Sequence, residues 1–200
     1  MMDWSKITVE QFVKTQKIIK EDPLDELDLH AQKKLIAEII TNKSIADIEN
    51  MKMRDLDAIY LDCLSPQLPT KIVRRFKLNG ISYEFNLDAT QMTSGRYMSI
   101  MESIKHNPLD NIHTVLFNVA HPVKRTLTGF KRYDFEPAEL HKRIEDFKQM
   151  PISIANPMAV FFCNLSVALT NVSVDYSVSQ MEMMNKEMNQ LAEDLTDGDG

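Results

Sequence analysis

The sequence predicts a mainly α fold, a multi-helix domain with one β-hairpin at about residues 72–87 packed on it. Only 5 Gly and 8 Pro occur in 200 residues, so long stretches carry no helix breaker. Apolar residues recur three and four positions apart along most of the chain, which is typical of amphipathic helices. The clearest strand-like alternation of apolar and polar residues lies at 76–87. We expect a single domain over 1–191 and a disordered acidic tail at 192–200.

The first third of the chain, at about 8–64, is expected to be a run of short helices. Thr8 and Gln11 have the spacing of a capping box, in which each side chain bonds the backbone N–H of the other residue. The helix that they begin should run to Lys20, because Asp22-Pro23 follows. Further helices are expected at about 27–41, from Ser44 onward and at 55–64.

Residues 71–88 contain the predicted hairpin. Apolar and polar residues alternate over 76–78 and over 81–87, on either side of Asn79-Gly80. Asn and Gly both tolerate positive φ, as the two central residues of a type I′ turn require. Because a lone hairpin is only marginally stable in water, its apolar face must pack on helices or gain further strands.

Helices should return over 93–191. We expect one after Thr93, one between Asn107-Pro108 and His121-Pro122, one from Pro137 and a last one capped by Asn156-Pro157. The basic residues 123–135 are expected to be turn-like, with at most a short irregular strand. The last helix should extend to Leu191, although alternation over 172–178 leaves a strand there as the alternative. The core residues expected in that helix are Phe161, Phe162, Leu165 and Leu169.

Composition and charge restrict the class of protein. No apolar stretch approaches the ~20 residues that cross a bilayer, and no apolar segment follows the first charges as in a secretory signal. Cys63 and Cys163 stand far apart without a partner pattern, which indicates reduced intracellular thiols that pack as small apolar side chains. The net charge of −6 disfavours nucleic acid as a partner. We therefore expect a cytoplasmic protein without membrane contact.

The sequence contains no motif for catalysis or cofactor binding. His106, Asp110 and His113 could hold a metal ion, but no cysteine or second carboxylate has ligand spacing around them, so we interpret these histidines as solvated or capping. Neither cysteine lies in a nucleophile elbow, and Gly95 alone does not make a phosphate-binding loop. We expect no catalytic, cofactor-binding or metal-binding residues, and a protein that is not an enzyme.

Two basic clusters are candidate partner-binding sites. The first consists of Lys71, Arg74, Arg75 and Lys77, and the second of Lys124, Arg125, Lys131 and Arg132. If the hairpin lies beside residues 123–135, these cations share one surface that could dock an acidic protein segment. The alternative is that they are the ordinary solvated charges of a hairpin face and a loop.

Methionines near the C-terminus form a second candidate surface. Met181, Met184 and Met188 fall on one face of the expected last helix, and flexible Met side chains suit apolar contacts with varied partners. Packing within the domain and contact with a second copy of the chain are the alternatives. Residues 182–200 carry six carboxylates and one lysine, a net charge of −5, which would keep an exposed apolar helix soluble.

Four segments occur in a characteristic order: Trp4-Ser5-Lys6-Ile7-Thr8, Phe76-Lys77-Leu78-Asn79-Gly80-Ile81, Met92-Thr93-Ser94-Gly95-Arg96-Tyr97, and Met150-Pro151-Ile152 leading to Ala159-Val160-Phe161-Phe162. Their order over about residues 4–176 resembles that of the tail assembly chaperone-like proteins of tailed bacteriophages, especially those of Bacteroidetes-type hosts. The resemblance implies a small helical protein of the host cell cytoplasm. Such a protein binds the long tape measure protein during tail assembly and is absent from the finished particle. The alternative is a structural virion component, such as a head–tail connector, tail or internal cargo protein, that forms a homo-oligomer.

Overall fold

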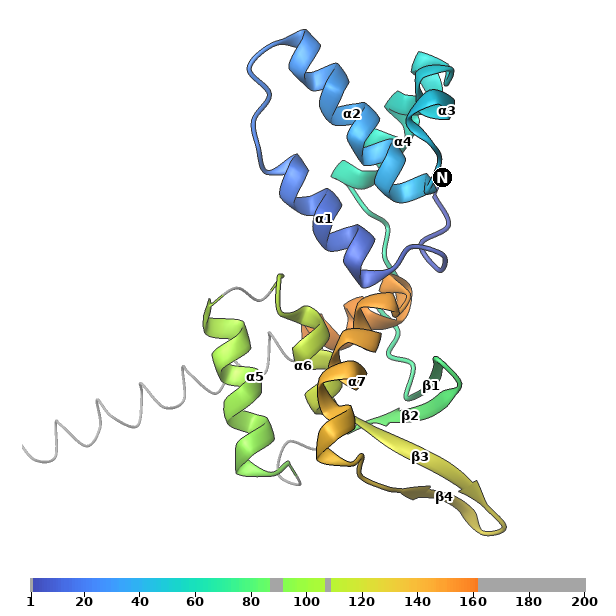
Figure 1. The fold of residues 1–200 in the computed structure, drawn as a ribbon, viewed down its shortest axis with the longest axis vertical. Coiled ribbons are helices and arrows are strands. Elements are labelled where there is room, and N and C mark those ends of the chain that lie inside the picture. Colours follow the sequence, from blue (N-terminus) through green and yellow to red (C-terminus); the bar gives the residue numbers. More distant parts are fainter. Residues whose placement is uncertain (1, 87–91, 107–108, 162–200) are drawn as a thin grey trace, which may run out of the picture. The chain divides into compact units, whose positions relative to one another are not determined.

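Helices and a four-stranded antiparallel sheet make up the described part of the chain, residues 2–86, 92–106 and 109–161 of a computed structural model (Figure 1). The chain divides into two units, Met1–Val160 and Phe161–Gly200, and the fold below is that of the first unit. The predicted mainly α class is confirmed. The prediction of a single hairpin is wrong, because the sheet has four strands.

The N-terminal third is a run of short helices, as the sequence predicts. They are α1 (Val9–Ile19), α2 (Glu26–Thr41), α3 (Ile45–Glu49) and α4 (Met53–Leu64). The capping box is confirmed: Thr8 Oγ1 accepts a hydrogen bond from the backbone N–H of Gln11 (3.2 Å), and Gln11 Oε1 accepts one from the N–H of Thr8 (3.0 Å). Ser44 caps α3, as predicted, by accepting a hydrogen bond from the N–H of Asp47.

The apolar faces of α2 and α4 are buried in the core of these helices. Ile36 and Ala37 of α2 and Leu56 of α4 are at most 1% exposed. Cys63 of α4 is fully buried, and burial raises the pKa of its thiol to about 12. The prediction that Cys63 packs as a small apolar side chain is confirmed, whereas Cys163 lies outside the described residues.

The four strands lie in the sheet in the order of the sequence. They are β1 (Arg75–Leu78), β2 (Ile81–Phe85), β3 (Ala120–Thr126) and β4 (Gly129–Arg132). The predicted hairpin is β1–β2, and both residues of its turn have positive φ, 45° at Asn79 and 82° at Gly80. These angles are those that a type I′ turn requires.

The second hairpin, β3–β4, corrects the prediction that residues 123–135 are turn-like with at most a short irregular strand. Helix α6 (Ile112–Val119) ends before His121, and the chain continues directly into β3. Pro122 therefore lies within a strand, opposite Tyr83 of β2. Its carbonyl accepts a hydrogen bond from the N–H of Tyr133 (3.1 Å), the residue that follows β4. In an antiparallel strand the N–H and C=O of one residue point to the same side, so the position of the missing proline N–H faces Tyr133 and not β2. The missing donor thus leaves the β2–β3 pairing unaffected.

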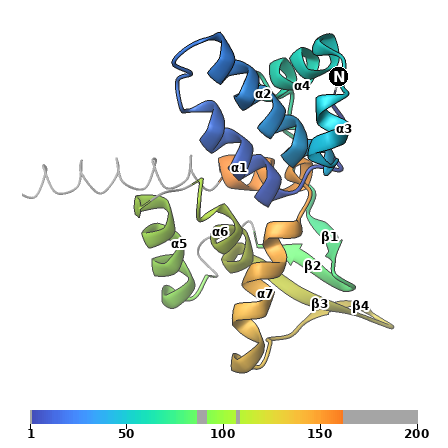
Figure 2. The same ribbon diagram turned by 45° about the horizontal axis from the view of Figure 1, so that its top comes forward.

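The inner face of the sheet is held by a cluster of aromatic rings. The ring of Phe147 lies 5.1 Å from that of Tyr83, 5.7 Å from that of Phe117 and 6.1 Å from that of Phe76, measured between centroids. Phe147 follows α7 (Leu140–Asp146), which lies between the 3-10 turns η2 (Pro137–Glu139) and η3 (Phe147–Gln149). The helix predicted from Pro137 therefore begins as a 3-10 turn. Helix α6 lies between α5 (Ser94–His106) and α7 (Figures 1 and 2).

A helix at residues 152–161 corrects the predicted cap at Asn156-Pro157. The helix begins directly after Pro151, and Pro157 lies inside it. Its buried face consists of Ile152, Ala155 and Met158, each 0% exposed. Phe161, predicted to be core, is half-buried. The other predicted core positions and the alternative strand at 172–178 lie outside the described residues.

Backbone hydrogen bonds to the N-terminal segment fix where this helix starts. The N–H of Ile152 donates to the carbonyl of Ile7 (2.8 Å), and the N–H of Val9 donates to the carbonyl of Met150 (2.8 Å). These two bonds flank an isolated antiparallel bridge between Thr8 and Pro151. The start of α1 and the start of the helix at 152–161 are therefore tied together, although they lie far apart in the sequence.

Candidate functional site

The alternation of side chains gives the sheet two different faces. Cross-strand partners share a face, and successive residues of a strand alternate between the faces. The inner face carries the buried rings of Phe76, Tyr83 and Phe85. The opposite face, called the outer face below, carries Arg75, Lys77, Ser82, Glu84, His121, Val123, Arg125, Phe130 and Arg132.

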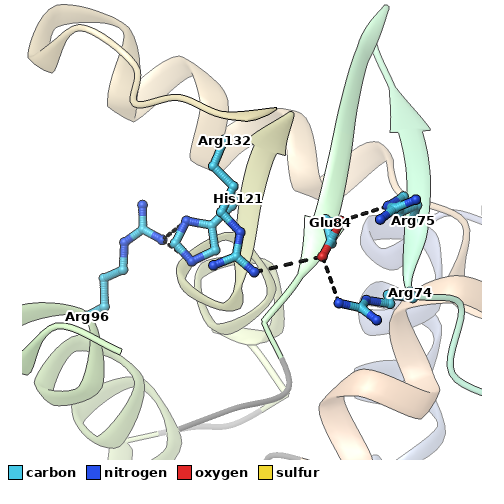
Figure 3. Close-up of polar contacts among 6 residues, drawn as sticks. All are labelled: Arg74, Arg75, Glu84, Arg96, His121 and Arg132. Atoms are coloured by element: carbon cyan, nitrogen blue, oxygen red, sulfur yellow. Dashed lines mark hydrogen bonds and ion pairs between the residues drawn. The ribbon is translucent and has the colours of Figure 1, made fainter. Parts of the chain in front are cut away.

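Glu84 is the centre of an ionic cluster on the outer face (Figure 3). It lies on β2 and is only 6% exposed. Its Oε2 accepts a hydrogen bond from Nε of Arg75 (2.7 Å), and its Oε1 accepts one from Nη2 of Arg74 (3.1 Å). Nη2 of Arg132 lies 3.8 Å from Oε1. Guanidinium groups from both sides of β2 thus converge on one carboxylate.

The cluster keeps Glu84 ionised and leaves an excess of positive charge. Burial by itself raises the pKa of Glu84, but the hydrogen bonds and charges of Arg75 and Arg74 outweigh it, so the pKa lies below its usual value. One negative charge therefore faces three guanidinium groups. Because each guanidinium has several N–H donors in a planar fork, most of these donors are not used by Glu84. Within the described residues these donors have no other partner, so they can bind a further carboxylate.

His121 extends the cluster on β3, where it is the cross-strand partner of Glu84. Nη1 of Arg96, from the first turn of α5, lies 2.9 Å from Nδ1 and 3.2 Å from Nε2 of His121 (Figure 3). A guanidinium group can only donate, so one of the two ring nitrogens must be unprotonated to accept a hydrogen bond. Burial of the ring and the charges of Arg96 and Arg132 lower the pKa of His121 to about 4. Asp134 lies 3.9 Å from Nη2 of Arg96. His121 is therefore neutral at pH 7 and adds no charge to the site.

As the pH is lowered from 6.5 to about 4, we expect the free energy of unfolding to decrease, in part because of His121. In the unfolded chain His121 takes up a proton near its ordinary pKa of 6.5, whereas in the folded chain it stays neutral down to about pH 4. The unfolded state therefore binds more protons in this range and is favoured as the pH falls. The contribution of His121 to the slope of the free energy of unfolding against pH is at most about 1.4 kcal/mol per pH unit. The substitution His121→Gln should remove this contribution, and urea unfolding at several pH values across the range measures it.

His113 serves as a comparison for that measurement. Burial also lowers the pKa of His113, so part of the slope should persist in His121→Gln. A slope in His121→Gln equal to that of the unsubstituted chain would contradict the neutral His121 of the folded state.

Residues 124–134 form an exposed arm that continues the outer face. Every residue from Lys124 to Asp134 is exposed, and Leu127 at its turn has no protection from solvent. The guanidinium carbon of Arg75 lies 4.4 Å from the centroid of the Phe130 ring. Arg75 and Phe130 belong to the two edge strands, which in a flat sheet would lie about 14 Å apart. The side chains of Arg75 and Phe130 therefore reach toward each other across the outer face.

The outer face and the side chains that reach it have a charge opposite to that of the chain as a whole. The six cations are Arg74, Arg75, Lys77, Arg96, Arg125 and Arg132, and the two carboxylates are Glu84 and Asp134. Their net charge is +4, whereas that of the whole chain is −6. This surface can therefore attract an anionic partner that the rest of the molecule repels.

Six of the eight residues of the two predicted basic clusters lie on one sheet, but the register separates them. Arg75, Lys77, Arg125 and Arg132 lie on the outer face, whereas Lys124 and Lys131 lie on the opposite side of the arm. Lys71 and Arg74 precede β1, and both are exposed. The predicted contact residues Met181, Met184 and Met188 lie outside the described residues, so their role stays a prediction.

Sequence reasoning missed Glu84, His121 and Arg96. The pairing of Glu84 with Arg75 could have been predicted from the sequence, because a two-residue turn at Asn79-Gly80 fixes the register of the hairpin. His121 and Arg96 had no such signal, because the strand that carries His121 was not predicted. The contact between them joins segments 25 positions apart in the chain.

Hollows elsewhere on the surface offer less for binding. One of about 490 Å³ lies between α1 and α2, and several polar side chains of its lining already have partners: Glu10 pairs with Lys14 and Gln149, and Gln11 donates to the carbonyl of Ile39. Within residues 2–86, 92–106 and 109–161, no three His, Cys, Asp or Glu side chains are grouped as ligands of a metal ion. In the same residues no helix has the length and apolar character needed to span a bilayer.

Comparison of the chain with protein-family models, with curated proteins and with solved structures finds no match. The outer face is therefore interpreted from its own geometry and charge.

Proposed function

We propose that this chain is a non-enzymatic tail assembly chaperone that holds an acidic segment of its protein partner on the outer face. The observation that carries the proposal is the ionic cluster around Glu84. This buried carboxylate holds Arg74, Arg75 and Arg132 around it, and most of their N–H donors have no partner among the described residues. Guanidinium groups positioned in this way bind carboxylates with little further loss of side-chain freedom.

The distribution of charge supports a protein partner with an acidic segment. A surface of +4 on a chain of −6 orients such a partner during encounter, because the remaining surface repels it. The resemblance of the sequence to tail assembly chaperones supplies the identity of the partner. It is the tape measure protein, held in the host cell cytoplasm while tails assemble.

Affinity capture with the tagged full chain from phage-infected cells tests this function, together with mass spectrometry of purified virions. We expect capture of a long helical tail protein and absence of the chain from virions. The captured protein should be released as the salt concentration rises, since exposed charges are screened beyond ~8 Å at physiological ionic strength. Stoichiometric presence in virions would instead assign a structural role, and failure to capture any tail protein would reject the chaperone.

A further inference from the structure

The outer edge of β4 carries unused backbone hydrogen-bonding groups. Strand order places β4 at the edge of the sheet, with β3 on one side, and no described residue pairs with its other side. All four residues of β4, Gly129–Arg132, are exposed. An exposed edge of this kind is a template for pairing with another strand.

The hydrogen bond from the N–H of Tyr133 to the carbonyl of Pro122 shows which groups of β4 face outward. In an antiparallel pair, residues that bond the neighbouring strand alternate with residues whose N–H and C=O point away from it. Since Tyr133 bonds toward β3, Lys131 does so too. The N–H and C=O groups of Phe130 and Arg132 therefore point away from the sheet and can accept a further strand.

The side chains at this edge specify the chemistry of that strand. Phe130, 45% exposed, and Arg132 lie on the outer face, and Lys131 lies between them on the opposite side. Directly opposite residues of an added strand would lie on the same face as these side chains. Carboxylates would pair with Arg132 and Lys131, and an apolar residue would pack on Phe130. The edge thus fits an extended acidic segment with an interspersed apolar side chain.

A second copy of the chain and a nucleic acid fit this edge less well. Antiparallel pairing of β4 with itself would bring Lys131 and Arg132 close to like charges, which destabilises a sheet. Phosphate groups accept hydrogen bonds but cannot donate to the outward carbonyls of Phe130 and Arg132. A peptide backbone satisfies both kinds of group.

We propose that the outer edge of β4 takes up an extended acidic segment of a protein partner as a fifth strand of the sheet. The inference rests on the proposed function in one respect, that the partner is a protein with an acidic segment. It adds the mode of binding, in which the backbone of Phe130 and Arg132 provides affinity and the cations beside them provide selectivity.

Selection of displayed random dodecapeptides on the immobilised full chain tests the inference first. We expect the enriched peptides to be acidic and to contain interspersed apolar residues. Fluorescence anisotropy then gives the affinity of one such peptide for the chain and for two variants, Arg132→Pro and Arg132→Ala. Both variants lose the guanidinium group, but only Arg132→Pro also loses the outward N–H. Proline is tolerated at an edge where the N–H faces solvent.

The expected result is that Arg132→Pro binds the peptide about tenfold more weakly than Arg132→Ala. Amide hydrogen exchange of the unsubstituted chain gives a second measurement that needs no variant: the peptide should protect the amides of Phe130 and Arg132. Equal affinities together with unprotected amides would overturn strand addition while leaving an acidic partner on the outer face. Enrichment of peptides without acidic residues, or tighter binding of a short DNA duplex, would overturn this inference as well as the partner assumed in the proposed function.

Discussion

Replacing Phe147 with alanine is expected to lower the free energy of unfolding by about 3–5 kcal/mol. Phe147 is 0% exposed, and its ring contacts those of Phe76, Tyr83 and Phe117 at centroid distances of 5.1–6.1 Å. The substitution removes buried apolar surface and leaves a cavity among rings that cannot close up completely. Urea unfolding followed by the fluorescence of Trp4, which is 7% exposed in the folded chain, measures the change.

Phe130→Ala is the matched control for this measurement. The same side chain is truncated, but Phe130 is 45% exposed and its ring contacts one guanidinium group. Its loss should cost no more than about 1 kcal/mol. A cost below 1 kcal/mol for Phe147→Ala as well would contradict the aromatic cluster as the main contact between the sheet and the segment around η3.

The features that the sequence predicted correctly are local in the chain. The capping box depends on two residues three positions apart, and the β1–β2 hairpin depends on Asn79-Gly80 and the alternation around it. Both features depend on hydrogen bonds and backbone angles of residues close together in the chain, so they do not require tertiary contacts. The same turn fixes the pairing of Arg75 with Glu84, so the sequence also contains enough information to predict this one contact of the site.

The second hairpin could not be predicted because its sequence lacks the alternation of apolar and polar residues that indicates a strand. A strand is recognised by apolar side chains that alternate onto one face, but residues 124–134 are exposed throughout, and Leu127 and Phe130 stand among mostly polar residues without such an alternation. Pro122 added a contrary signal, since proline is typical of helix ends and loops. What makes β3 a strand is the pairing of its first half with β2, a contact between segments more than 30 positions apart.

The start of the helix at 152–161 was ambiguous for a different reason. Pro151 and Pro157 are both acceptable near the beginning of a helix. The choice between them is made by the bonds of Ile152 and Met150 to the segment around Thr8, which no local pattern encodes. For the site, likewise, the sequence identified the cations but not the buried carboxylate that organises them.

Reversing the charge of two outer-face cations should weaken binding of an acidic partner at least about tenfold. Lys77 and Arg125 are the appropriate positions, because both are exposed on the outer face and neither pairs with Glu84. The double variant Lys77→Glu/Arg125→Glu therefore changes the field of the surface without breaking the ionic cluster. The affinity of an enriched acidic peptide and the amount of captured tail protein are the two measurements.

The matched control is Lys43→Glu/Lys52→Glu, which gives the same change in net charge at exposed positions next to α3 and α4. If the outer face binds the partner, this control should lose less than about threefold at physiological salt, where exposed charges farther than ~8 Å from the partner are screened. The difference between the two double variants should also shrink as salt is added, because it comes from exposed charges. Equal losses in both would show that net charge alone governs binding, and the outer face would then have no special role. A loss confined to Lys77→Glu/Arg125→Glu would instead place the acidic segment beside the Glu84 cluster, since Lys77 and Arg125 lie on that face, whereas Lys43 and Lys52 lie next to α3 and α4.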